Sequence, residues 1–195
     1  MDFFITLDNT YTDNELQSIF AELNFLQFSG NFLDPSETGS ARIEDTDKNL
    51  KYKNNKGVFL DSIYSDRNTS VILKLNRKLF DINIDFVNLP PIFKLYQSVK
   101  HDTTLVSYYE DGGSYFSHRD IAHYTAVTYL YKTPKKFTGG NLILHDHNAT
   151  LEPVFNRTYI FPSYVDHEVT PVEMSKEHAN LGFGRYCISN FMIAI

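Results

Sequence analysis

From residue 103 onward the chain is a series of β-branched and aromatic runs, and this series limits the possible folds more than any other feature. The runs alternate in character instead of following the helical period, and they lie at 103–109, 124–131, 141–147, 157–163 and 185–195. Turn-forming residues separate them: Asp111-Gly112-Gly113, Gly139-Gly140 and Asn148. This pattern is typical of antiparallel strands in a sandwich or barrel. We therefore predict a mainly β (α+β) fold with an eight-stranded jelly-roll core, a double-stranded β-helix.

The first half of the chain predicts helices and loops. Residues 2–7 form a short apolar run that fits a strand. Thr12 and Glu15 have the spacing of a capping box, and apolar residues follow at helical period, so we expect a helix over residues 12–24. Residues 66–81 show a similar period and predict a second helix, whereas residues 30–56 are rich in loop-forming residues. No linker divides the chain, so we expect one domain over 1–195, with 1–100 supporting a core at 104–193.

Composition limits the classes of function. The net charge is −6, and no basic stripe is present, which disfavours a nucleic-acid partner. The single cysteine, Cys187, excludes an internal disulfide and a CxxC zinc site. No apolar run is long enough for a membrane span, and the N-terminus does not resemble a signal peptide. We therefore expect a cytoplasmic protein without a membrane partner.

Three side chains are candidates for a metal site. His118 and Asp120 lie two residues apart, so both can point to one side of a strand. A chain of this composition contains about one such His-x-acid triplet by chance, so the pair alone is weak. His167 adds a third ligand at the end of another β run. Two histidines and one carboxylate suit Fe(II), because they leave adjacent coordination positions open for oxygenase chemistry.

Arg185 is a candidate partner for a carboxylate. It begins the last β run, where it would share a face with Cys187, Ser189 and Phe191. A guanidinium binds a carboxylate in a bidentate manner, so it could hold the far end of a metal-chelating dicarboxylate. A surface ion pair or a capping role for Arg185 is equally compatible with the sequence alone.

Five segments together resemble the catalytic core of prolyl-4-hydroxylase-like Fe(II)/2-oxoglutarate-dependent dioxygenases. The segments are YYEDGGSYFSHRD, YTAVTYLY, TGGNL, LEPVFNRTYIFPSYVDHEVTPV and GRYCISNF, and the similarity covers about residues 104–193. The resemblance implies iron ligands at His118, Asp120 and His167, and a catalytic role for these residues and Arg185. It also implies hydroxylation of an unactivated C–H, of a prolyl or other peptidyl residue, with release of succinate and CO2. Ascorbate would serve as reductant.

The resemblance also assigns the surroundings of the metal. Arg185 would bind the distal carboxylate of 2-oxoglutarate, with Tyr108, Tyr129 and Ser189 in the same pocket. Tyr115, His123 and Phe191 are candidates for substrate contact. Loops at 30–56 and 172–184 are candidates for a substrate lid.

Alternatives remain open from the sequence. A cupin-like barrel that binds a metal without oxygenase activity would explain the histidines but not Arg185. An oxygenase could also act on a free amino acid or small metabolite. His145 and His147 would alternate along one strand and could form another metal pair, although a role at the surface or pocket rim is favoured. Cys187 is expected to be an interior residue and not a nucleophile, because no His–acid pair accompanies it.

Overall fold

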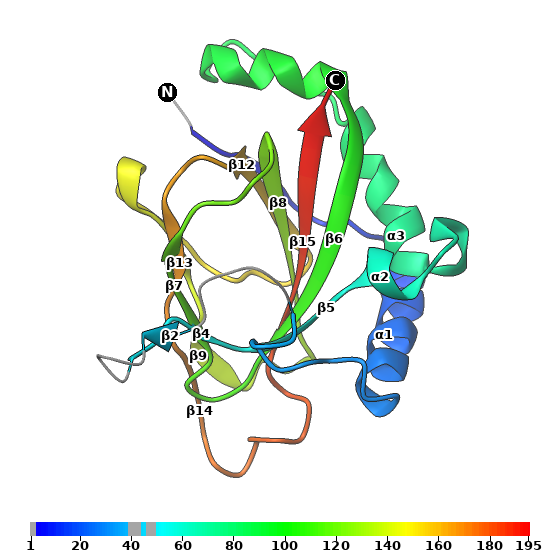
Figure 1. The fold of residues 1–195 in the computed structure, drawn as a ribbon, viewed down its shortest axis with the longest axis vertical. Helices are drawn as coiled ribbons and strands as arrows, with labels where there is room; N and C mark the ends of the chain where they lie inside the picture. The colour runs from blue at the N-terminus through cyan, green and yellow to red at the C-terminus, as the bar shows by residue number, and fades with distance from the viewer. Residues whose placement is uncertain (1–2, 39–43, 46–49) are drawn as a thin grey trace.

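Two antiparallel sheets face each other in the computed structural model, which describes residues 3–38, 44–45 and 50–195 (Figure 1). The larger sheet has six strands, in the order β1 (Ile5–Leu7), β12 (Arg157–Pro162), β8 (Tyr124–Leu130), β15 (Arg185–Ala194), β6 (Val99–Tyr109) and β5 (Lys56–Phe59). The smaller sheet has five, in the order β11 (Ala149–Leu151), β10 (Leu142–Leu144), β13 (His167–Val169), β7 (Ser114–His118) and β4 (Lys53–Asn54). Two further sheets have two strands each: β14 (Val172–Met174) pairs with β9 (Phe137–Gly139), and β2 (Glu44–Asp45) pairs with β3 (Leu50–Lys51).

This arrangement is the predicted jelly-roll type. Eight of the strands in the two facing sheets come from residues 99–194, as the β-branched runs predict. The first half of the chain adds β1, β4 and β5 at the edges, and of these only β1 was predicted. β4 and β5 were missed because they are two and four residues long and lie in a polar segment without clear alternation.

Helices cover the outer face of the larger sheet (Figure 1). They are α1 (Asp13–Phe28), α2 (Leu60–Ile63) and α3 (Val71–Asn76), with the 3₁₀ helices η1 (Arg67–Thr69), η2 (Arg77–Asp81) and η3 (Pro91–Ser98). The capping box of α1 is present: Glu15 N–H donates to Thr12 Oγ1, and Thr12 N–H donates to Glu15 Oε2. The predicted helix at 12–24 is thus confirmed and extends to Phe28. No described helix is long and apolar enough to cross a membrane.

The predicted continuous helix at 66–81 is wrong, because Ser70 interrupts it. The Ser70 backbone is extended, and its hydroxyl accepts from Leu73 N–H as the cap of α3. The same hydroxyl donates to Glu22 of α1 at 2.6 Å. A serine with these local and tertiary partners favours a helix start over a helix interior. The segment is therefore η1, α3 and η2 in succession.

Alternation along the central strands produces two different environments. On the outer face, Val106 of β6 and Ile188 of β15 pack against α1 and α3 residues such as Leu23 and Ile72. On the inner face, Tyr129 of β8 joins a cluster formed with the smaller sheet. Side chains at odd positions of β6, β8 and β15 therefore turn toward the space between the sheets, where a cavity lies.

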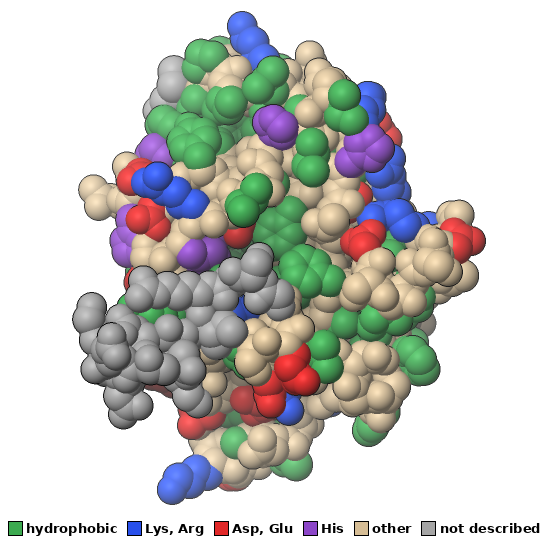
Figure 2. Space-filling view, in the orientation of Figure 1, with side chains coloured by type: hydrophobic (Ala, Val, Ile, Leu, Met, Phe, Trp, Pro, Cys, Tyr) green, Lys and Arg blue, Asp and Glu red, His purple; other side chains and the backbone are tan. Residues whose placement is uncertain are grey.

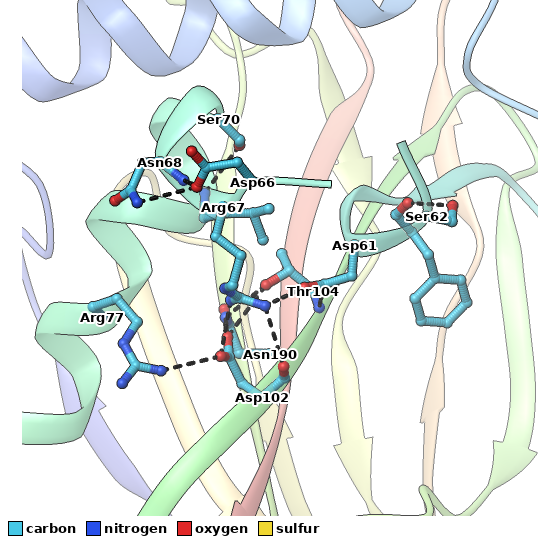
Figure 3. Close-up of polar contacts among 12 residues, drawn as sticks. Asp61, Ser62, Asp66, Arg67, Asn68, Ser70, Arg77, Asp102, Thr104 and Asn190 are labelled. Atoms are coloured by element: carbon cyan, nitrogen blue, oxygen red, sulfur yellow. Dashed lines mark hydrogen bonds and ion pairs between the residues drawn. The ribbon is translucent and has the colours of Figure 1, made fainter. Parts of the chain in front are cut away.

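A buried acid, Asp102 of β6, connects the helical layer to the larger sheet (Figure 3). Its Oδ1 accepts from Arg67 Nη2 at 2.8 Å, and its Oδ2 accepts from Asn190 Nδ2 of β15 at 2.9 Å. Arg67 also pairs with Asp61, which in turn accepts from Thr104 N–H at 2.8 Å. This network places η1 and α2 on the sheet through polar contacts.

Candidate metal centre

His118, Asp120 and His167 meet at one point between the two sheets. His118 ends β7 and His167 begins β13, and the two residues are direct partners in the antiparallel register. Asp120 follows β7, where its N–H donates to Ser163 O at 3.0 Å. Its Oδ1 lies 3.8 Å from His118 Nε2, and its Oδ2 lies 3.4 Å from His167 Nε2. One ligand atom from each residue thus falls within 4.8 Å of the others.

Hydrogen bonds orient both imidazoles for metal binding. His118 Nδ1 lies 2.8 Å from Phe116 O, and His167 Nδ1 lies 2.9 Å from Val165 O. A carbonyl oxygen can only accept, so each Nδ1 carries a proton, and each Nε2 is the ring nitrogen that can bind a metal when it is deprotonated. Ligands bound at about 2.1 Å and at right angles lie about 3 Å apart, which is close to the observed spacing. The arrangement fits one divalent ion with little movement.

Thr125 was missed by the sequence analysis, although it lies in the quoted run YTAVTYLY. Its hydroxyl donates to Asp120 Oδ2 at 2.7 Å and lies 2.9 Å from the Ser163 hydroxyl. The sequence contained one signal for this contact, a threonine close in the chain to a candidate Asp ligand. Only the pairing of the strands shows that the hydroxyl reaches this carboxylate.

Burial and mutual charge set the protonation of the three groups. Burial and the neighbouring charge of His167 together lower the pKa of His118 to about 4, so His118 is neutral at pH 7. Burial alone would lower the pKa of His167, but the hydrogen bond and charge of Asp120 raise it above the usual value. Burial alone would raise the pKa of Asp120, but its hydrogen bond with His167 keeps that pKa below normal. In the metal-free protein, the charge of Asp120 therefore favours the protonated form of His167.

Metal binding should consequently weaken as the pH falls. A metal must displace the His167 proton, whose pKa is raised, so affinity is complete above that pKa and decreases below it. We expect the affinity for Mn(II) to decrease by up to about tenfold per pH unit below the raised pKa of His167. Calorimetry in buffers of different ionisation enthalpy would detect a proton release on metal binding that increases as the pH falls through this pKa. A pH-independent affinity, or the same proton release in His167→Ala, would contradict this assignment.

The three side chains line a cavity of about 520 Å³ that reaches into the β-sandwich. Figure 2 shows hydrophobic side chains gathered near the middle of one face of the molecule, with histidines around them. Inside the cavity the walls are mixed: Tyr109, Val127, Tyr129, Leu142, Cys187, Ser189 and Phe191 contribute among others. Ile121, 99% exposed, stands at the rim directly after Asp120.

Arg185 is fully buried beside this cavity. Its guanidinium lies 4.1 Å from the ring centre of Tyr109 and 5.0 Å from that of Tyr129, and both rings line the cavity. Nη1 donates to Gly140 O at 2.6 Å, while Nε and Nη2 have no hydrogen-bond partner. No described carboxylate lies within 4.0 Å of Arg185. A buried cation in this state is costly unless an anion binds it.

Gly139-Gly140 permits this approach. Both residues have a positive φ, 66° and 67°, as expected for a tight turn. A Cβ on Gly140 would lie 3.4 Å from Arg185 Cδ and 3.0 Å from Val172, so the turn also leaves room for the arginine.

The prediction for Tyr108 is wrong, and Tyr109 takes the expected place. Tyr108 points to the helical side of β6, where its hydroxyl donates to Glu110 and accepts from Gly184 N–H. Tyr109 is the register partner of Arg185 and therefore shares its face. The sequence alone held no signal for this choice, because the register between β15 and β6 is needed to know which positions of β6 face inward.

The other predicted site residues divide into two groups. Tyr129, Ser189, Tyr115 and Phe191 line the cavity, and Tyr115 stacks on His118 with ring centres 3.7 Å apart. His123 does not line it: the side chain is exposed, and Nδ1 accepts from Ala194 N–H. Substrate contact by His123 is therefore not supported by its position.

The prediction that His145 and His147 alternate along one strand is wrong. The chain leaves β10 at Leu144 and forms the short 3₁₀ helix η4 (His145–His147), which ends at Asn148 with φ 47°. His145 pairs with Glu168 at 3.2 Å, and His147 stacks on Phe3. The two side chains thus have separate surface partners. Cys187 lines the cavity, and burial raises the pKa of its thiol, which disfavours a nucleophile.

The two candidate lid segments differ in position. From 30–56, the described residues Thr38, Lys53 and Asn55 line the cavity. From 172–184 no residue lines it, since β14 pairs with β9 instead. The second segment is therefore wrong as a lid candidate. The first remains a hypothesis, in part outside the described residues.

Comparisons with known proteins agree with this geometry. Residues 104–192 match the model of the 2OG-Fe(II) oxygenase superfamily. A search of curated proteins gave no match to the chain. This family match goes against the cupin-like alternative, because it covers the segments that supply the metal ligands and Arg185.

Solved structures of prolyl hydroxylases have a similar fold. A viral collagen prolyl hydroxylase from Paramecium Bursaria Chlorella virus-1 is 13% identical, with a TM-score of 0.61 over 100% of this chain and 97% of that one. A Pseudomonas putida prolyl-4-hydroxylase is 15% identical, with a TM-score of 0.58 over 99% and 93%. A Trichoplax adhaerens prolyl hydroxylase is 16% identical, with a TM-score of 0.59 over 100% and 84%. The chain thus has the fold of these prolyl hydroxylases, and the segment that resembles the 2OG-Fe(II) oxygenase superfamily contains the His-Asp-His cluster.

Proposed function

We propose that this enzyme hydroxylates a prolyl or other peptidyl residue at an unactivated C–H, using Fe(II) bound by His118, Asp120 and His167. The supporting observation is that the buried guanidinium of Arg185, which has no carboxylate partner, lies against the rings of Tyr109 and Tyr129, and these rings line the same cavity as the three residues. A dicarboxylate that chelates the metal at one end needs such a partner at the other. O2 would be the oxidant, and bound Fe(II) and 2-oxoglutarate would supply its activation: one oxygen atom would enter the substrate as hydroxyl and the other would enter succinate, with release of CO2 and with ascorbate as reductant.

The protein's own side chains would orient and shield the reaction. Arg185 would hold the distal carboxylate through Nη2 and Nε, which have no other partner. The rings of Tyr109 and Tyr129 hold the guanidinium and exclude water around it. Phe59, Leu105, Val127 and Phe191 provide apolar walls nearer the larger sheet. A cavity of this size and a rim open at Ile121 fit a peptide whose reacting residue enters toward the metal.

The test of this proposal is the formation of succinate from 2-oxoglutarate with Fe(II), ascorbate and proline-containing peptides. We expect iron-dependent succinate formation coupled to a 16 Da gain on one peptide, and its loss in His118→Ala. His123→Ala is the matched control, because His123 lies outside the cavity, and it should retain activity. Zinc-supported activity, or equal turnover by His118→Ala, would contradict the proposal. Succinate without peptide modification would point to a free amino acid or small metabolite.

Tyr129 gives a finer prediction. Its hydroxyl is fully buried without a hydrogen-bond partner, beside the guanidinium of Arg185. If it donates to bound 2-oxoglutarate, Tyr129→Phe should weaken 2-oxoglutarate binding about five- to tenfold, the value of one hydrogen bond. Tyr108→Phe, on β6 of the same sheet but facing the helices, should leave that affinity unchanged. Titration of 2-oxoglutarate into the Mn(II)-loaded protein measures both. Equal effects of the two variants on 2-oxoglutarate affinity would contradict the assignment of Tyr129 to the cosubstrate pocket and of Tyr108 to the helical side.

A further inference from the structure

A second buried cation, Lys53, lies on the opposite side of the metal cluster from the larger sheet. It begins β4, pairs with Tyr115 of β7 and lines the same cavity. Only 5% of the residue is exposed. Its Nζ lies 5.3 Å from the ring centre of Tyr115, the ring that stacks on His118. Lys53 is thus one aromatic ring away from a candidate metal ligand.

Lys53 has no counter-ion among the described residues. Its Nζ donates to Thr38 Oγ1 at 3.3 Å, and no described carboxylate lies within 4.0 Å. Burial lowers the pKa of Lys53, while the negative charge of Asp120 opposes that change. One hydroxyl does not replace the hydration of an ammonium group, so this placement is unfavourable for folding alone.

The charges of the proposed loaded site leave Lys53 uncompensated. Fe(II), Asp120, dianionic 2-oxoglutarate and Arg185 have formal charges that sum to zero. Asp120 is the only carboxylate among the described residues that line the cavity, whereas Lys53 and Arg119 both line it as cations. The chain as a whole has a net charge of −6, so this local excess of positive charge is contrary to its composition. The excess of positive charge indicates that the substrate, which enters after the metal and 2-oxoglutarate, carries an anionic group.

Asn55 extends the same wall. It lies two residues after Lys53, lines the cavity and is 7% exposed. Its amide nitrogen and amide oxygen are both buried, and neither makes a hydrogen bond within 3.5 Å, although the pKa of the Tyr109 hydroxyl, which burial raises, is lowered slightly by this nearby amide. An unsatisfied amide beside an unpaired ammonium is a polar surface without a protein partner, and buried polar groups are normally satisfied.

We propose that the peptide substrate carries a carboxylate side chain close to the hydroxylated residue, and that Lys53 binds this carboxylate while Asn55 hydrogen-bonds the adjoining peptide backbone. The proposal rests on the proposed function, in which the substrate is a peptide, and it adds that this peptide carries a negative charge near the reacting residue. Lys53 is thus a specificity-determining residue, and Arg185 remains the partner of the cosubstrate. An acidic segment near the hydroxylation site distinguishes this substrate class from neutral proline-rich peptides.

The test compares pairs of fluorescent peptides that contain one central proline and differ only by Glu or Gln at a single flanking position, from three residues before to three after. Binding is measured by anisotropy with the Mn(II)- and 2-oxoglutarate-loaded protein, so that no turnover is required. We expect the Glu peptide to bind about tenfold tighter or more at one or more positions. Lys53→Met should remove this preference, and Lys53→Arg should retain it in part. Lys135→Met, outside the cavity, should leave it intact.

Two results would overturn the inference. One is that the wild-type protein shows no preference for Glu over Gln at any position, or that Lys53→Met shows the same preference as the wild type. The other is a Lys53→Met protein with weakened 2-oxoglutarate binding and unchanged peptide preference, because Lys53 would then serve the cosubstrate. Failure of the proposed function is a separate result: it is the absence of iron-dependent 2-oxoglutarate consumption by the wild-type protein, which the succinate assay detects without any choice of flanking residue.

Discussion

Replacing Arg185 with methionine should weaken 2-oxoglutarate binding by about a hundredfold or more. The reason is that a buried carboxylate would lose its bidentate partner, a loss that costs about 2–5 kcal/mol. The 2-oxoglutarate affinity of Arg185→Lys should lie between those of the wild type and Arg185→Met, since an ammonium keeps the charge but not the geometry for two parallel hydrogen bonds. Calorimetric titration of the Mn(II)-loaded protein measures the affinity.

The same substitution should not destabilise the fold. In the protein without ligand, the guanidinium is buried without a carboxylate, so a methionine of similar length removes an uncompensated charge. We expect a melting temperature equal to or above that of the wild type. Arg157→Met is the matched control, because Arg157 pairs with Asp8 at the surface and should not affect 2-oxoglutarate. Wild-type affinity in Arg185→Met would remove the main support for the proposed cosubstrate site.

Asp102→Ala should have the largest effect on stability. Asp102 is 8% exposed and accepts from Arg67 and Asn190, so its removal takes one of two carboxylate partners from Arg67 and one of two acceptors from the buried amide of Asn190 (Figure 3). Breaking such a buried pair costs about 3–5 kcal/mol, which lowers the melting temperature of a domain of this size by about 10 °C. Urea denaturation followed by circular dichroism measures the free energy of unfolding.

The control for this experiment is Asp85→Ala. Asp85 is exposed and accepts one hydrogen bond, from Val87 N–H. Its loss should cost less than about 1 kcal/mol. If Asp102→Ala and Asp85→Ala are equally stable, the polar network does not hold η1 and α2 on the sheet, and apolar packing alone accounts for that interface.

The order of the β runs and the identity of the chemical groups could be inferred from the sequence alone. Alternation and turn residues are local properties, so they predicted β6, β8, β12 and β15, and Thr12 with Glu15 predicted the start of α1. The spacing of His118, Asp120 and His167, read with the family resemblance, named the residues that the structure brings together.

Only the tertiary structure decided which side chains share a space. Tyr108 and Tyr109 are adjacent and chemically identical, and the pairing of Arg185 with Tyr109 across β6 and β15 selects the second for the cavity. Lys53 and Asn55 lie in a polar segment that reads as a loop, and only the pairing of β4 with β7 places them beside the metal cluster. The physical reason is the same in each case: conformation along a strand is set by neighbouring residues, whereas burial and charge are set by groups that are distant in the chain.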